Sequence, residues 1–176
     1  RIIMDKVFLD ENKQYWFDFT KVDAVWKTHE ISNKITLSDV DFIAKTDKEM
    51  LFIEYKNANI KNANKPNELY ENLKSDKKMN QLVKKYYDSL LVFWAFQNKN
   101  DLPIKYIFLV EGPLIDADFR RRIKFNLMNR LPFKLENKND TKRFISSLEV
   151  YNLEEFKDNV PQITITPFVE NDFNVK

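Results

Sequence analysis

The chain of 176 residues has no cysteine, one histidine (His29) and one glycine (Gly112). Without cysteine it has no disulfide, no thiolate-bound zinc or iron–sulfur site and no thiol nucleophile. A single histidine excludes metal sites with several histidine ligands and leaves His29 as the only histidine that could serve as a base. A single glycine excludes the dinucleotide-binding fingerprint and the phosphate-binding loop, which both need several glycines. Any catalysis therefore rests on Asp, Glu, Lys, Tyr, Ser or Thr, with oxygen ligands for any metal.

Long apolar runs are also lacking. None approaches the roughly 18–20 residues of a membrane span, so we expect no membrane partner and a cytoplasmic protein. The composition is 43% hydrophobic and 14% aromatic, without a linker-like stretch, which predicts one folded domain over residues 1–176. The net charge of +2 is close to balance and carries little information about partners, so only local clusters of basic residues would indicate nucleic acid.

The pattern of apolar residues predicts an α/β fold with one mixed central sheet flanked by helices. Near the N-terminus, Tyr15, Phe17 and Phe19 alternate as on a strand, and we expect a helix to begin near Thr20. Strands are expected at Ile35–Lys45, Met50–Lys56, Ile104–Val110, Leu148–Tyr151 and Gln162–Phe168, and helices at Ser75–Gln97, Asp116–Leu131 and Leu153–Asp158.

The expected hairpin of Ile35–Lys45 and Met50–Lys56 has a register that can be deduced from its loop. A loop of two or four residues sets Lys45 opposite Met50, whereas three or five residues would not. Counting back along the strands then pairs Ala44 with Leu51, Ile43 with Phe52, Asp41 with Glu54 and Asp39 with Lys56. Residues that face each other in this way have Cβ atoms about 4.5–5.5 Å apart.

Two opposed carboxylates in an apolar sheet repel each other, unless one takes up a proton or a cation lies between them. Mg²⁺ favours such a site, with water and substrate phosphate as its other ligands. Lys56 shares a strand face with Glu54, where its ammonium can stabilise charge that develops on a phosphate. Asp41, Glu54 and Lys56 are therefore suited to metal-assisted hydrolysis of a phosphodiester. The alternative is a solvated hairpin face that carries Asp–Lys and Glu–Lys pairs.

The segments DVDFIA (residues 39–44) and LFIEYK (residues 51–56) resemble the PD-(D/E)XK nuclease superfamily, especially its small bacterial resolvase-like members. The resemblance implies a restriction-endonuclease-like core in which Asp41 and Glu54 bind Mg²⁺ or Mn²⁺. It further implies that the Tyr55 carbonyl is a metal ligand and that Lys56 is the catalytic lysine. Val40 stands where many members have proline.

Several other polar residues are candidates for supporting roles. Family members often place a glutamine or lysine near the metal waters at the position of Gln81, and some supply a third carboxylate, for which Glu30 and Asp23 are candidates. Each could equally be a solvated or helix-capping residue. Asp39 is expected either to bind the metal or to pair with Lys56, and His29 is a base only by default.

Basic residues follow the hairpin and predict contacts with phosphates. A charged outer helix face would give the same pattern. The expected nucleic-acid-binding residues are Lys61, Lys65, Lys77, Lys78, Lys84 and Lys85, with Arg120–Arg122 as a second cluster. The sequence thus predicts a metal-dependent nuclease, with DNA favoured over RNA as its substrate. The alternative is a non-catalytic nuclease-fold module that binds nucleic acid or protein, and a homodimer is left open.

Overall fold

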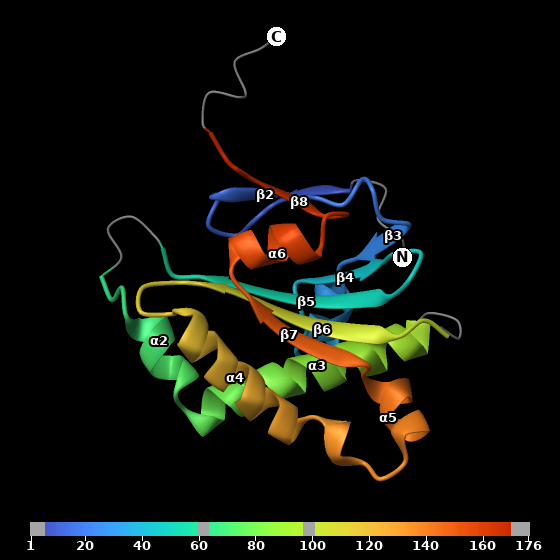
Figure 1. The fold of residues 1–176 in the computed structure, drawn as a ribbon. Coiled ribbons are helices and arrows are strands. Elements are labelled where there is room, and N and C mark those ends of the chain that lie inside the picture. The colour runs from blue at the N-terminus through green and yellow to red at the C-terminus, as the bar shows by residue number, and fades with distance from the viewer. Residues whose placement is uncertain (1–5, 60–63, 97–100, 170–176) are drawn as a thin grey trace.

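A five-stranded mixed sheet forms the centre of the protein in its computed structural model, which describes residues 6–59, 64–96 and 101–169 but not the side chains of Glu30 and Ile31 (Figure 1). The strands lie in the order β3-β4-β5-β6-β7; β4 runs antiparallel to both of its neighbours, β3 and β5, and β5, β6 and β7 run parallel. Their bounds are β3 Ala24–Trp26, β4 Phe42–Lys45, β5 Met50–Asn57, β6 Ile104–Glu111 and β7 Ser147–Tyr151. The expected α/β class with a mixed sheet is confirmed.

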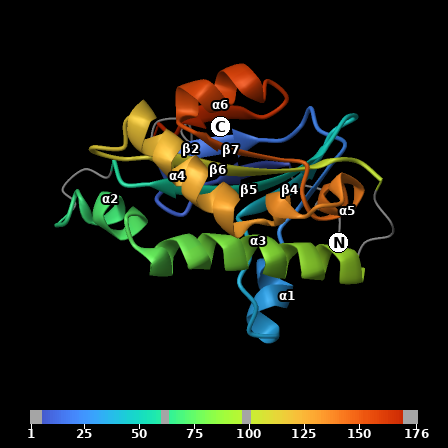
Figure 2. The same ribbon diagram turned by 60° about the horizontal axis from the view of Figure 1, so that its bottom comes forward.

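Helices α2 to α5 lie on one side of this sheet, and α3 runs along its face (Figures 1 and 2). The helices are α1 His29–Lys34, α2 Glu68–Leu73, α3 Asp76–Phe96, α4 Ala117–Arg130, α5 Lys138–Phe144 and α6 Leu153–Asn159, with a 3₁₀ turn at Pro132–Lys134. Within the described ranges, no helix combines the length and apolar character needed to cross a membrane.

The opposite side of the central sheet is covered by α6 and by a second, antiparallel sheet. This sheet has the order β1-β2-β8, with β1 Val7–Leu9, β2 Tyr15–Asp18 and β8 Thr164–Pro167. The C-terminal strand therefore pairs with β2 and does not extend the central sheet, which corrects the expectation of a single sheet.

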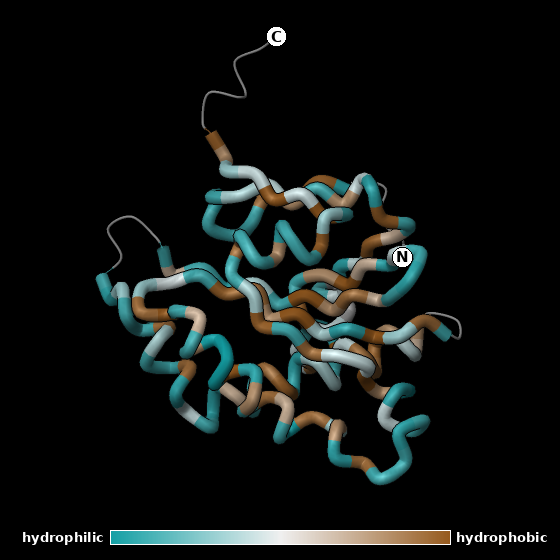
Figure 3. The backbone as a smooth tube through the Cα atoms, viewed as in Figure 1, coloured by the Kyte–Doolittle hydropathy of each residue, from teal (hydrophilic) through white to brown (hydrophobic). Residues whose placement is uncertain are grey.

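Side chains of β5 alternate between the two faces and so enter two separate apolar clusters. Met50 and Phe52 pack with α3 and α4, whereas Leu51, Ile53 and Tyr55 pack beneath the second sheet and α6. Coverage on both faces explains the continuous apolar run of this strand. Figure 3 shows hydrophobic residues concentrated along the central strands and hydrophilic residues in the outer loops and along parts of the helices.

The expected register of the β4–β5 hairpin is confirmed: Lys45 pairs with Met50, Ala44 with Leu51 and Ile43 with Phe52. The long helix, the central strand β6 and the later helices are also close to their expected bounds. Two of the expected elements in the N-terminal half of the chain are wrong. No helix begins near Thr20, because the chain turns there and Ala24–Trp26 pairs with β4 as a strand. The strand expected from Ile35 begins only at Phe42.

Candidate functional site: a buried carboxylate between lysines

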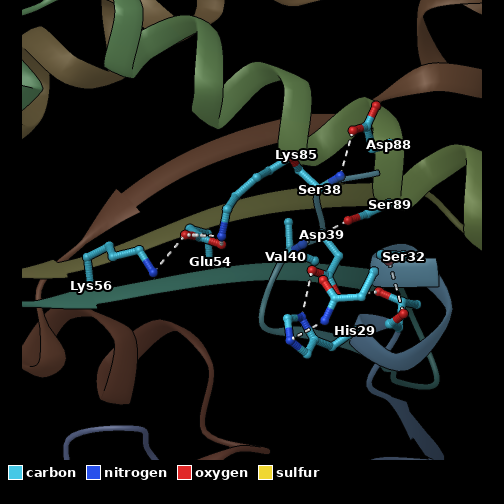
Figure 4. Close-up of polar contacts among 12 residues, drawn as sticks. His29, Ser32, Ser38, Asp39, Val40, Glu54, Lys56, Lys85, Asp88 and Ser89 are labelled. Carbon is cyan, nitrogen blue, oxygen red and sulfur yellow. Dashed lines mark hydrogen bonds and ion pairs between the residues drawn. The ribbon is translucent and has the colours of Figure 1, made fainter. Parts of the chain in front are cut away.

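The Glu54 side chain is 0% exposed, although it carries a carboxyl group. Since Met50 and Phe52 face α3, the alternation of β5 turns Glu54 toward the same helix. There the Lys85 ammonium donates to both carboxylate oxygens, at 2.9 Å to Oε1 and 3.0 Å to Oε2. Lys56 Nζ lies 3.2 Å from Oε1 on the other side (Figure 4). Two cations thus compensate a carboxylate that has no contact with solvent.

Opposing electrostatic effects act on the Glu54–Lys56 pair. Burial raises the pKa of Glu54, and the Asp41 carboxylate raises it further, while Lys56 and Lys85 oppose the rise. For Lys56, burial disfavours the charged form, but the carboxylates of Glu54 and Asp41 outweigh it and raise the pKa above 10.5. Lys56 is therefore an ammonium at neutral pH and can act as a positive charge, not as a proton acceptor.

Asp41 directly precedes β4 and is the carboxylate that the sequence predicts opposite Glu54. The backbone pairing of β4 with β5 ends with Phe42 opposite Ile53. The next position along both strands therefore places Asp41 opposite Glu54. The Asp41 carboxylate accepts a hydrogen bond from the Tyr55 backbone N–H at 2.7 Å. Because the N–H and C=O of one strand residue point the same way, the Tyr55 carbonyl is turned to this edge as well. Asp41, Glu54, Lys56 and the Tyr55 carbonyl are thus brought to one end of the hairpin.

Two residues of α3 hold the segment before Asp41 in place. Asp88 accepts a hydrogen bond from the Ser38 N–H, and the Ser89 hydroxyl accepts one from the Val40 N–H, both at 2.8 Å. These bonds attach residues 38–40 to the helix, which explains why the strand expected from Ile35 is shorter. Sequence reasoning missed both positioning residues, and no sequence signal marks them except that Ser89 is a polar residue on the inward face of α3.

Lys85 was expected to bind nucleic acid, and its contact with Glu54 was also missed. A signal for it exists in the sequence. Lys85 lies three residues after Leu82 and four before Ser89, which are both buried, so it belongs to the inward face of α3. A lysine at such a position needs a buried acceptor, and Glu54 is the buried carboxylate of the facing strand.

Asp39 is not opposite Lys56, so that expectation is wrong. The ladder ends before it, and its carboxylate instead accepts hydrogen bonds from the Thr28 hydroxyl at 3.2 Å and from His29 Nδ1 at 3.3 Å. The Asn33 amide lies 2.8 Å from His29 Nε2, so an imidazole protonated on Nδ1 satisfies both contacts. Figure 4 shows this group beside the Glu54 cluster, with His29 largely exposed.

The remaining supporting candidates differ in their position. The Asp23 N–H bonds to the Lys45 carbonyl, which places Asp23 at the opposite end of β4 from Asp41 and away from the site. Gln81 is an exposed residue of α3. Lys61 and the Glu30 side chain lie outside the described parts of the structure, so their predicted roles stay predictions.

The lysines and arginines of the two basic clusters differ in their exposure and in whether they form ion pairs within the protein. Lys84 pairs with Asp88, while Lys65 and Lys77 are exposed and Lys78 is half-buried. In the second cluster Arg120 is 7% exposed and pairs with Glu155, so it connects α4 to α6 and is not part of an open basic surface.

The oxygen atoms at the end of the β4–β5 hairpin where Asp41 and Glu54 lie are suitable ligands for a divalent cation. Asp41 and Glu54 offer carboxylate oxygens, and Tyr55 offers a carbonyl oxygen; these are the hard ligands that Mg²⁺ and Mn²⁺ prefer. Within the described residues, no group of three or more His, Asp or Glu side chains could hold a metal. A cation here would thus depend on two carboxylates and would compete with Lys85 for Glu54.

Neither a protein-family model, nor a curated protein, nor a solved structure matches the chain.

Proposed function

We propose that the protein is a metal-dependent nuclease that hydrolyses phosphodiester bonds in DNA, with a site of the PD-(D/E)XK type. The observation that carries this proposal is the arrangement of Asp41, Glu54 and Lys56 at one end of the β4–β5 hairpin, with Glu54 fully buried. A buried carboxylate beside a second one is costly for stability, so it is expected where a site needs it.

Each residue has a separate role in this proposal. Asp41, Glu54 and the Tyr55 carbonyl would hold Mg²⁺ or Mn²⁺, which when bound supplies Lewis-acid chemistry and lowers the pKa of water. Lys56 stays protonated and stabilises the negative charge that develops on the phosphate in the transition state. Asp88 and Ser89 hold the chain before Asp41 and so orient its carboxylate. DNA rather than RNA as substrate, a homodimer and a cytoplasmic location stay predictions.

One observation favours the alternative of a non-catalytic nuclease-fold module that binds nucleic acid or protein. Both oxygens of Glu54 are already occupied by Lys85, so the carboxylate is neutralised without a metal. In that case the charge cluster would be a structural element, and metal would neither bind nor support cleavage.

Cleavage of supercoiled plasmid, DNA oligonucleotides and RNA with Mg²⁺, Mn²⁺ or EDTA decides between the two functions. We expect nicking that requires metal, is lost in Lys56→Ala and persists in Lys48→Ala. Lys48 is a matched control because it is exposed in the loop at the opposite end of the hairpin. If wild type and Lys56→Ala prepared in the same way give equal cleavage, or none, the nuclease proposal is refuted.

A further inference from the structure

Lys78 lies on the face of α3 that is turned to the candidate site. Lys78, Gln81 and Lys85 follow each other at intervals of three and four residues and therefore share one side of the helix. Lys85 is fixed on Glu54, so this side faces the end of β5, where Lys56 also lies. Lys78 is two turns nearer the N-terminus of α3, about 10 Å along the helix axis.

The lysines of this region differ in their partners. Lys74 pairs with Glu71, Lys84 with Asp88 and Lys85 with Glu54. Within the described parts of the chain, the Lys78 ammonium has neither a hydrogen bond nor an ion pair. It is half-buried, while the preceding Lys77 is exposed. Lys78 is thus a cation that is partly withdrawn from water without a carboxylate of its own.

Charges around Lys78 favour an anion. Burial lowers the pKa of Lys78, and the ammonium groups of Lys56 and Lys85 lower it further, with Glu54 opposing. Glu54 is shared by two other lysines and cannot neutralise a third. An anion that contacts Lys78 and Lys56 together would relieve the repulsion between them, whereas Lys85 is already engaged.

We propose that Lys78 and Lys56 together bind one phosphate group of the substrate next to the Asp41–Glu54 pair. The inference rests on the proposed nuclease function and names the residue that would fix the nucleic-acid backbone at the site. Two lysines suit a backbone phosphate, because ammonium groups bind it as point charges without reading the base sequence. Lys84 and Lys85, which have carboxylate partners, would contribute less than Lys78.

Binding of a labelled DNA duplex in EDTA, across a range of KCl concentrations, tests the inference without cleavage. We expect Lys78→Ala to weaken binding about three- to tenfold and to reduce the slope of log affinity against log salt by about 0.9, as for one lost phosphate contact. Lys77→Ala removes the same charge from the same helix turn and should change the slope by less than half as much. Thermal melting shows whether both variants fold.

Separate outcomes refute the two proposals. If wild type binds and cuts DNA but Lys78→Ala and Lys77→Ala have the same slope, the inference on Lys78 is wrong and the nuclease function stands. If wild type binds no nucleic acid, the nuclease function fails, and inorganic phosphate and pyrophosphate become the probes. A rise in melting temperature with either, in wild type but not in Lys78→Ala, then supports a phosphate site with another source of ligand. No rise overturns the inference as well.

Discussion

Replacing Lys85 with methionine removes one of the two cations on Glu54 and keeps most of the length of the side chain. Breaking a buried ion pair from one side costs roughly 3–5 kcal/mol, since it leaves the other charge uncompensated. Glu54 is 0% exposed, but Lys56 stays 3.2 Å from it, which favours the lower end of that range. We therefore expect Lys85→Met to lower the free energy of unfolding by about 3 kcal/mol at pH 7.5.

This loss should depend on pH in a defined direction. Because the pKa of Glu54 is raised above 4.5 in the folded protein, the folded state keeps its proton at a pH where the unfolded chain has lost it. Stability therefore falls as pH rises from 4.5 through the folded pKa. Lys85 lowers the pKa of Glu54, so this pKa is higher in Lys85→Met than in wild type. The variant therefore loses more stability than wild type as pH rises. The difference between variant and wild type should be small near pH 4.5 and greatest at neutral pH.

Urea denaturation between pH 4.5 and 8 measures the effect, with an expected midpoint shift of roughly 1.5 M at pH 7.5 for an m-value of about 2 kcal/mol/M. Lys77→Met is the control, because it removes an exposed lysine from the same helix, and a substitution at such a surface position changes stability by about 0.5 kcal/mol at most. The double variant Glu54→Gln/Lys85→Met should recover most of the lost stability. If the double variant is as unstable as Lys85→Met, or if the loss does not vary with pH, Lys85 does not act through the Glu54 charge.

Two further predictions concern the metal and the second basic cluster. Mn²⁺ at about 100 times its Kd should stabilise the protein by about 2.7 kcal/mol, or roughly 5–10 °C in Tm. Glu54→Gln should abolish this gain, whereas Lys56→Ala should keep it; an unchanged response in Glu54→Gln would contradict the ligand assignment. Arg120→Ala should lower the free energy of unfolding by about 2–4 kcal/mol because it leaves Glu155 without its partner and removes a buried side chain. Arg121→Ala, at a pair on the surface, should change it by less than about 1 kcal/mol, and equal losses in urea denaturation would refute the structural role of Arg120.

Local pattern is sufficient to predict the parts of the fold that carry the site. The β4–β5 register follows from loop length and strand alternation alone, and the same counting places Asp41 opposite Glu54. Short strands are less predictable. Tyr15, Phe19, Val22 and Trp26 fit a helical spacing, but they belong to two strands and the turn between them, which are stabilised by pairing with distant segments.

Side-chain contacts between distant helices and strands cannot be predicted from the sequence alone. Whether Lys85 meets Glu54 depends on the rotation of α3 over the sheet, and whether Asp39 extends the hairpin depends on Asp88 and Ser89, which lie some fifty residues further along. Both are decided by packing of the whole domain, so the sequence predicts the site itself but not the residues that neutralise and position it.

The bond from the Tyr55 N–H to Asp41 has a consequence for association between molecules. Beyond Ile53, β5 continues while its antiparallel neighbour has ended, and a strand that outruns its partner offers backbone groups to any extended segment of another chain. The Asp41 carboxylate occupies the first N–H of that stretch, and the charged Lys56 follows directly after it. Loss of the Asp41 carboxylate would leave the Tyr55 N–H without this acceptor, so an Asp41 variant is to be judged by its stability and aggregation as well as by its activity.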